Sequence, residues 1–300
     1  KTTGAIQTQI TSSDIKWETK TTKNIGLDAA FLNNKFELTA EYYSSTTSDI
    51  LVGVPIPLSV GANNSPTVNA GKLRNSGLEF SLTYRKTAGD LNFNITANAS
   101  TLNNEVLALG GNDEPIPGVG SRTAVGGEIG RHYGYVYDGL FQSQQAINNH
   151  AFQNAATAPG DIRFKDLNDD GVINDLDRTY LGSAIPSINY GLNITGNYKN
   201  FDFTVFASGM GGYKVHSRMY RMLMLPSYFL NYHTDMLDRW TPQNTNTDIP
   251  RRVSGDPNNN GRNSDRPGWL QDGTHLRINT VSLGYNLPQK VLDYVGARST

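Results

Sequence analysis

The chain has 300 residues, no cysteine, and a formal net charge of −1 from 26 basic and 27 acidic residues. The balanced charge excludes the basic surface that nucleic-acid binding requires, and the lack of cysteine excludes disulfides and thiolate metal sites. No run of about 18 apolar residues occurs, so transmembrane helices are excluded. A membrane β-barrel remains compatible with the mean hydropathy of −0.46, because only alternate strand residues of a barrel face lipid.

The first predicted element pair is a β-hairpin over residues 25–43. Apolar residues at 36, 38, 40 and 42 alternate with polar residues at 37, 39 and 41, which is the period of a strand with one apolar face. A second alternating segment covers 25–31, and Asn33 with Asn34 supplies a turn that tolerates positive φ.

The same construction recurs twice along the chain. Residues 78–85 and 91–98 form one predicted hairpin with a turn at 87–90, and residues 188–195 and 201–205 form another with a turn at Lys199 and Asn200. A last strand over 276–287 changes the parity of its apolar residues, which predicts a β-bulge near Asn279 or Thr280.

Long polar segments separate the hairpins. They cover about residues 50–75, 107–186 and 210–273, and they exceed the connections of an ordinary compact domain. Short turns at one end and long loops at the other are typical of an outer-membrane barrel. The sequence therefore predicts an all-β chain that is one portion of a single transmembrane antiparallel β-barrel with long extracellular loops. Tyrosines near the strand ends suit an interfacial girdle, although a soluble β-sandwich would bury similar residues.

The sharpest motif is a cation-binding pattern in the second long loop, of the form DxNxDGxIxxxD. Oxygen-bearing residues at alternate positions and a glycine at the bend match an EF-hand-type loop, in which the seventh position supplies a backbone carbonyl. The predicted ligands are Asp166, Asn168, Asp170, Val172, Asn174 and Asp177. Because aspartate replaces the usual glutamate at the twelfth position, a weak or structural Ca²⁺ site is expected. An Asp- and Asn-rich turn without an ion is the alternative.

Aromatic residues gather in the two longest loops. Stacking on sugars, gripping of peptides and packing of loop against loop or against a partner are all open to them. The candidate binding residues are Tyr133, Tyr135, Tyr137, Tyr220, Tyr232 and Trp240.

Signatures of catalysis are lacking. The histidines show no zinc-binding spacing, and the chain contains neither a nucleophile elbow nor a phosphate-binding loop. We expect no enzyme activity and no organic cofactor.

Five stretches, in order along the chain, carry a family resemblance. They resemble the SusC/RagA family of TonB-linked outer-membrane transporters from Bacteroidota. The stretches are IKWETKTTKNIGLDAAFLNNKFELTAEYY, NAGKLRNSGLEF, GDIRFKDLNDDGVINDLDRTYLGSAIPSINYGLN, DRWTPQNTNTDIPR and LRINTVSLGYNLP.

The resemblance implies a barrel of about 22 antiparallel strands around an N-terminal plug. Such a barrel imports glycans or peptides beneath a SusD-like surface lipoprotein and is energised through TonB. By the same resemblance the chain is the C-terminal portion, and the plug, the TonB-contacting region and the last strands are expected outside it.

Three hypotheses about function follow. The first is active import across the bacterial outer membrane by a SusCD-like complex. The second is a passive porin or a small adhesive or binding barrel. The third is a soluble calcium-dependent carbohydrate-binding β-protein, whose site would combine the Asp166 loop and the aromatic residues.

Overall fold

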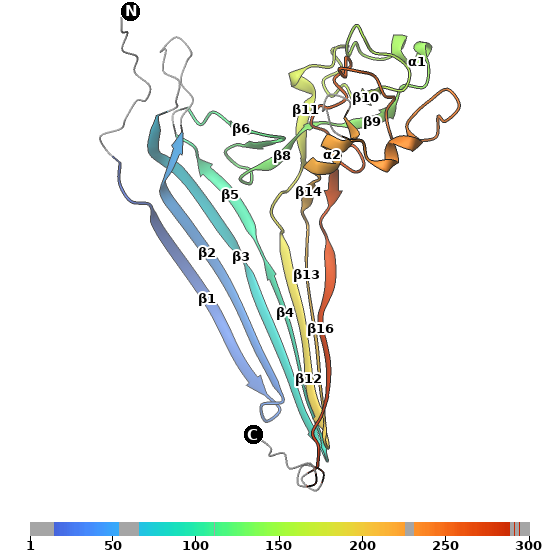
Figure 1. Ribbon diagram of the computed structural model, residues 1–300. Coiled ribbons are helices and arrows are strands. Elements are labelled where there is room, and N and C mark those ends of the chain that lie inside the picture. Colours follow the sequence, from blue (N-terminus) through green and yellow to red (C-terminus); the bar gives the residue numbers. More distant parts are fainter. Residues whose placement is uncertain are drawn as a thin grey trace, which may run out of the picture.

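The computed structural model describes residues 15–53, 66–110, 112–225 and 231–288, together with positions 291 and 294. One tall antiparallel sheet dominates it, in the order β1-β2-β3-β4-β12-β13-β16, with β5 paired to β3 (Figure 1). The strands are β1 (Thr19–Phe31), β2 (Phe36–Gly53), β3 (Thr67–Ala88), β4 (Leu91–Thr101), β5 (Asn103–Ala108), β12 (Ile188–Tyr198), β13 (Phe201–Gly211) and β16 (His275–Tyr285). The strands β1 and β16 lie at the two edges of this sheet.

The three predicted hairpins are confirmed. Tight turns join β1 to β2, β3 to β4 and β12 to β13, and all three lie at the same end of the sheet (Figure 1). Their backbones enter the left-handed region at Asn33, Asn34, Gly89 and Lys199. Asparagine and glycine tolerate that region well, which is why these short turns were visible in the sequence.

The register of the paired strands aligns their alternating apolar and polar residues, so that the sheet has two continuous faces. Residues that pair across neighbouring antiparallel strands share a face. One apolar row crosses seven strands, and the residues beside it form a largely polar row on the opposite face. The apolar row is Ala29, Leu38, Leu82, Ala97, Leu192, Ala207 and Ile278; the adjacent row is Ala30, Glu37, Thr83, Thr96, Asn193, Phe206 and Thr280.

The apolar face carries no covering layer of described residues. Ile25, Val281 and Leu283 are 72%, 72% and 74% exposed. Water contact at so many aliphatic side chains is costly, at about 1.5–3 kcal/mol for each one that a folded protein would otherwise bury. A single sheet of this kind is stable as the wall of a barrel in a bilayer, where the apolar face meets lipid.

The bulge predicted in the last strand is confirmed. Phe206 pairs with Thr280 and Ala207 pairs with Ile278, so Asn279 is the extra residue on β16. It restores Leu276 and Ile278 to the face of Val281 and Leu283. Among the described helices, none is long and apolar enough to cross a membrane.

The three predicted loops have different bounds or more order than expected. Residues 50–53 belong to β2 and residues 67–75 to β3, so most of the described part of the 50–75 segment is strand. The polar and β-branched residues there pair across the sheet without the clean alternation that marks an amphipathic strand.

The 107–186 and 210–273 segments contain short regular elements. These are β6 (Ile116–Gly118), β7 (Ser121–Thr123), β8 (Arg131–Tyr135), β9 (Tyr137–Leu140), α1 (Gln144–Asn148), β10 (Ile162–Phe164), η2 (Asp175–Asp177), β11 (Arg178–Gly182), β14 (Lys214–His216), α2 (Arg218–Met224), η3 (Thr234–Asp238) and β15 (Leu270–Asp272). Together they form a body at the end of the main sheet opposite the tight turns (Figure 1). We call the described residues of 112–186 and 212–274 the cap.

Candidate functional site

The cap has its own hydrophobic core, assembled from both long segments. Phe164 and Trp269 have no exposed surface, and the ring of Tyr135 lies 5.3 Å from that of Phe164. The complete cluster is Tyr135, Leu140, Ile162, Phe164, Ile173, Leu225, Trp240 and Trp269. The two segments therefore fold onto each other as one unit.

Backbone contacts join the segments directly. The amide of Tyr135 donates to the carbonyl of Asn263 at 2.8 Å, in a short parallel bridge between Tyr135 and Ser264. This approach depends on Gly134, where a Cβ atom would stand 2.2 Å from the carbonyl oxygen of Asn263. A larger residue at that position would force the segments apart.

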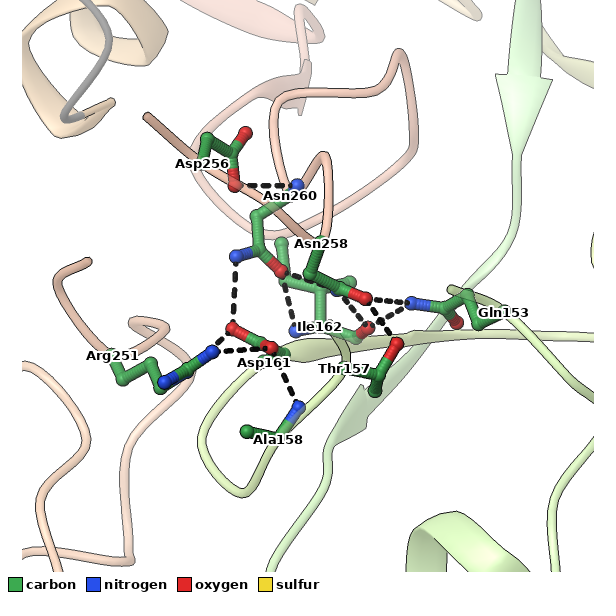
Figure 2. Close-up of polar contacts among 9 residues, drawn as sticks. All are labelled: Gln153, Thr157, Ala158, Asp161, Ile162, Arg251, Asp256, Asn258 and Asn260. Atoms are coloured by element: carbon green, nitrogen blue, oxygen red, sulfur yellow. Dashed lines mark hydrogen bonds and ion pairs between the residues drawn. The ribbon is translucent and has the colours of Figure 1, made fainter. Parts of the chain in front are cut away.

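Asp161 is a fully buried carboxylate of the cap (Figure 2). Its carboxylate has no exposed surface and accepts hydrogen bonds from Arg251 Nε at 2.8 Å and Nη2 at 3.0 Å. Asn260 Nδ2 donates at 3.1 Å, and the amide of Ala158 donates at 2.9 Å. Four donors offset the cost of removing this carboxylate from water.

Buried amide side chains extend this network (Figure 2). Asn260 Oδ1 accepts from the amide of Ile162 at 2.8 Å, and Gln153 Oε1 accepts from the amide of Phe164 at 3.0 Å. Asn258 lies between them and accepts from Gln153 Nε2 at 3.2 Å and from Thr157 Oγ1 at 2.6 Å. The side chains of Asn260 and Gln153, which lie more than 90 positions apart in the sequence, thus accept hydrogen bonds from the backbone amides of the short strand β10.

Four of the six predicted aromatic residues serve the packing of the cap. Tyr135 and Trp240 lie in its core. The hydroxyl of Tyr137 donates to Asp248 at 3.1 Å, and that of Tyr220 donates to Asp235 at 2.8 Å. Burial first, and then the acceptor carboxylate, raises the pKa of Tyr137. These contacts agree with the loop-packing alternative.

The other two predicted aromatic residues carry cations on their rings. The Arg252 guanidinium lies 4.6 Å from the ring centre of Tyr232. Tyr133 packs 5.3 Å from Tyr180 and lines a pocket of about 470 Å³ in the cap. Of the six, Tyr133 lines this pocket and Tyr137 lines a separate one of about 360 Å³.

The predicted cation loop has the backbone of a tight Asx-rich turn. Asp166 accepts from the amides of Asp169 at 2.8 Å and Gly171 at 2.9 Å, and Gly171 takes φ +80°. Its bend also places Ile173 in the cap core, where the amide of Ile173 donates to Phe152 at 2.8 Å. The loop is anchored to the cap by its apolar residue, and it exposes the carboxylates of Asp169 and Asp170.

Within the loop, Asp170 and Asp177 have different roles. Asp170 is exposed and accepts from Asn168 Nδ2 and the Val172 amide, each at 2.9 Å, and from Asn174 Nδ2 at 3.4 Å. The hydrogen bond from Asn168 and then that from Val172 lower the pKa of Asp170.

By contrast, Asp177 is fully buried. Its two oxygens accept from the amides of Leu167 at 2.9 Å and Asn174 at 2.7 Å, so it closes the turn as the third helical residue of the capping box that begins at Asn174. Among the described residues, no three His, Cys, Asp or Glu side chains converge as a metal cluster. A cation here would therefore rely on amide and carbonyl oxygens in addition to Asp166 and Asp170.

Sequence reasoning missed the basic residues around Tyr133. Arg122 and Arg178 line the same pocket, and Asn263 reaches it from the second long segment. Arg178 carries a usable signal, since it lies two residues before Tyr180, and this spacing places a cation and an aromatic ring on one face of a strand. No local pattern indicates Asn263.

A second pocket, of about 520 Å³, lies against the main sheet. Its lining is mostly from the polar face, with Glu41 opposite Glu79 and with Asn98 and Asn189 nearby. Phe206 is the one aromatic residue of its row and also lines this pocket. The polar face therefore carries a pocket whose lining combines carboxylate, amide and aromatic side chains.

A protein-family model matches most of the chain. Residues 2–220 match the family described as TonB dependent receptor-like, beta-barrel. The TonB-dependent receptor P3 of Formosa agariphila is 32% identical over 99% of the chain, and the TonB-dependent receptor SusC of Bacteroides thetaiotaomicron is 31% identical over 64%. The chain spans 30% and 19% of the length of these relatives.

Solved structures give a matching fold. The structure of the RagAB peptide transporter superposes with a TM-score of 0.72 at 22% identity and covers 93% of the chain and 30% of that protein. The RagAB peptide importer in an open-open state superposes equally well, over 29% of its length. Both matches concern the sheet and the cap together.

Proposed function

The chain belongs to the SusC/RagA family of TonB-dependent outer-membrane receptors, and from this membership we propose that the intact protein imports glycans or peptides across the outer membrane. Energy would reach it through TonB, and a SusD-like surface lipoprotein would cover its outer face. The chain supplies part of the wall of the transmembrane β-barrel. No covalent chemistry is needed for such a role.

The observation that carries the proposal is the pairing of a two-faced sheet with a folded cap. The apolar face suits lipid and the polar face suits an aqueous lumen. The cap stands at the end of the sheet opposite the short turns, which in outer-membrane barrels is the extracellular end (Figure 1). A solute entering the lumen would pass the cap first.

Uptake measurements test the proposal against the passive porin. We expect cells that lack the intact receptor to lose uptake of its substrate, and cells that retain the receptor but lack TonB to lose it equally. Copurification of a surface lipoprotein with the receptor tests the partner. Uptake that continues at an unchanged rate without TonB would support passive diffusion through a pore.

The loop 166–177 is proposed to hold a structural Ca²⁺. Asp166, Asn168, Asp170 and the Val172 carbonyl supply hard oxygens at the spacing that this cation prefers. The lowered pKa of Asp170 favours its charged form, which is the form that a cation requires. Rotating the side-chain amide of Asn168 by half a turn would place its Oδ1 atom, instead of Nδ2, beside Asp170.

Matched substitutions test the calcium proposal. Asp170→Asn removes a ligand charge and is expected to weaken Ca²⁺ binding by roughly tenfold or more. Asp169→Asn keeps a residue that tolerates its φ of +58° and changes no proposed ligand, so binding is expected to stay the same. Calorimetric titration of the intact receptor with Ca²⁺ measures both variants. Equal affinities in the two variants would refute the site.

A further inference from the structure

The pocket beside Tyr133 is built from four separate parts of the cap. The hairpin of β6 and β7 supplies Pro117, Ser121 and Arg122, and β8 supplies Tyr133. Arg178 comes from the start of β11, and Asn263 comes from the second long segment. At about 470 Å³, the pocket lies within the size range of small-molecule sites.

Two guanidinium groups flank Tyr133 in this pocket. The guanidinium carbon of Arg122 lies 4.9 Å from the ring centre, and that of Arg178 lies 5.6 Å from it. Arg122 Nη1 also donates to the Tyr133 hydroxyl at 2.9 Å. These contacts hold the forks of both arginines against one rigid ring, so little side-chain freedom would be lost when a ligand binds.

The cations of the pocket exceed its anions. Arg178 pairs with Asp175 at 2.9 Å, but Asp175 is 78% exposed, and such a pair is weak. In the part of the chain that the structure describes, no carboxylate pairs with Arg122. The Nε atom of Arg178 is buried and likewise finds no acceptor among the described residues. A buried donor without an acceptor is costly, so the pocket favours a ligand that accepts hydrogen bonds.

We propose that this pocket binds a carboxylate group of the imported ligand through Arg122 and Arg178. The planar guanidinium fork matches a carboxylate in shape and charge, and Ser121 and Asn263 add polar groups at its edge. A peptide C-terminus and a uronic-acid sugar both present this group. The inference rests on the proposed import function and adds the chemical class of its substrate.

Binding to the purified intact receptor tests the inference without requiring uptake. The probes are N-acetyl-tetra-alanine and its C-terminal amide, and tetragalacturonate and its methyl ester. We expect one acid to bind more tightly than its neutral form, and the acid that does so identifies the source of the carboxylate. Arg122→Gln is expected to weaken binding of that acid by about tenfold or more, because hydrogen bonds to charged groups are strong. Binding of the neutral form should change little.

Two further variants separate binding from folding. Arg122→Lys keeps the charge and loses the fork, so it should recover part of the affinity. Arg131→Gln is the matched control, because Arg131 pairs with Arg122 across β7 and β8 and packs on Tyr180 outside the pocket. Its affinity for the acid should equal that of the wild type.

Three outcomes would overturn the inference. They are the failure of both acids to bind more tightly than their neutral forms, no binding of either acid, and an equal loss of affinity in Arg122→Gln and Arg131→Gln. A receptor that binds the acid but supports no TonB-dependent uptake would overturn the proposed function and leave this inference standing.

Discussion

Replacing Asp161 with alanine is expected to destabilise the cap by about 3–5 kcal/mol, because removing one partner of a buried ion pair leaves the other charge uncompensated. Arg251 would lose both of its bonds to the carboxylate. Asn260 Nδ2 and the Ala158 amide would each lose an acceptor as well. Since Asn260 also holds the Ile162 amide, the damage should spread to β10 (Figure 2).

Amide hydrogen exchange in the intact receptor measures this effect. Exchange at Ile162 and Phe164 should accelerate by about a hundredfold or more if it proceeds through cap opening. The strands of the main sheet should keep their protection, because the described hydrogen-bond partners of the Asp161 carboxylate all lie in the cap. Retained protection at Ile162 would show that Arg251 and Asn260 find other partners.

Asp138→Ala is the matched control for Asp161→Ala. Asp138 also pairs with an arginine, Arg163, at 2.8 Å, but the two side chains are 48% and 34% exposed. An exposed pair of this kind contributes about 0–1 kcal/mol. Exchange in the cap should therefore change little, and a loss equal to that of Asp161→Ala would contradict the importance of burial.

Replacing Leu192 with arginine is expected to destabilise the barrel by about 2–4 kcal/mol, which is the cost of a basic residue on the lipid face near the bilayer centre. Leu192 lies near the middle of β12 and belongs to the apolar row that crosses seven strands. Its neighbours in that row are Ala97 and Ala207, so no carboxylate pairs with it across the strands. The charge would have to reach the interface or remain unpaired.

Asn193→Arg adds the same charge one position along the same strand. Asn193 pairs with Thr96 and Phe206, on the polar face of the sheet. We expect its free energy of unfolding to stay close to that of the wild type. Denaturant titration of the intact receptor in phospholipid vesicles measures both variants. If Asn193→Arg cost as much as Leu192→Arg, the assignment of the two faces would be wrong.

The wall of the barrel was predictable from local patterns. A strand with one face toward lipid must alternate apolar and polar residues. This period of two can be seen within a window of eight residues, as at 36–43. Turns with positive φ select asparagine or glycine, as at Asn33 and Gly89. Even the bulge at Asn279 followed from a change of parity. Strand ends were less predictable, because residues 67–75 pair without alternating.

The cap was predicted only as long loops that carry candidate residues. Its core joins Tyr135 to Trp240 and Trp269. Trp240 and Trp269 do not belong to any hydrophobic periodicity in the sequence that would mark them as buried. The pocket beside Tyr133 was equally hard to predict. Tyr133 was a candidate binding residue, but its partners Arg122 and Asn263 were not. Proximity of residues on separate segments depends on how the segments fold together, which no short window of sequence records.

The sequence by itself determined the architecture of the wall: antiparallel strands with one apolar face, tight turns at one end, and the parity change in the last strand. Each of these depends on residues that are neighbours in the chain, so the period and the allowed φ of single residues suffice. Only the tertiary structure decided how the long segments become a cap. The bonds that hold it, such as Asp161 to Arg251 and Gln153 to Asn258, join residues 90 and 105 positions apart. Burial made those bonds necessary, and burial is a property of the folded chain.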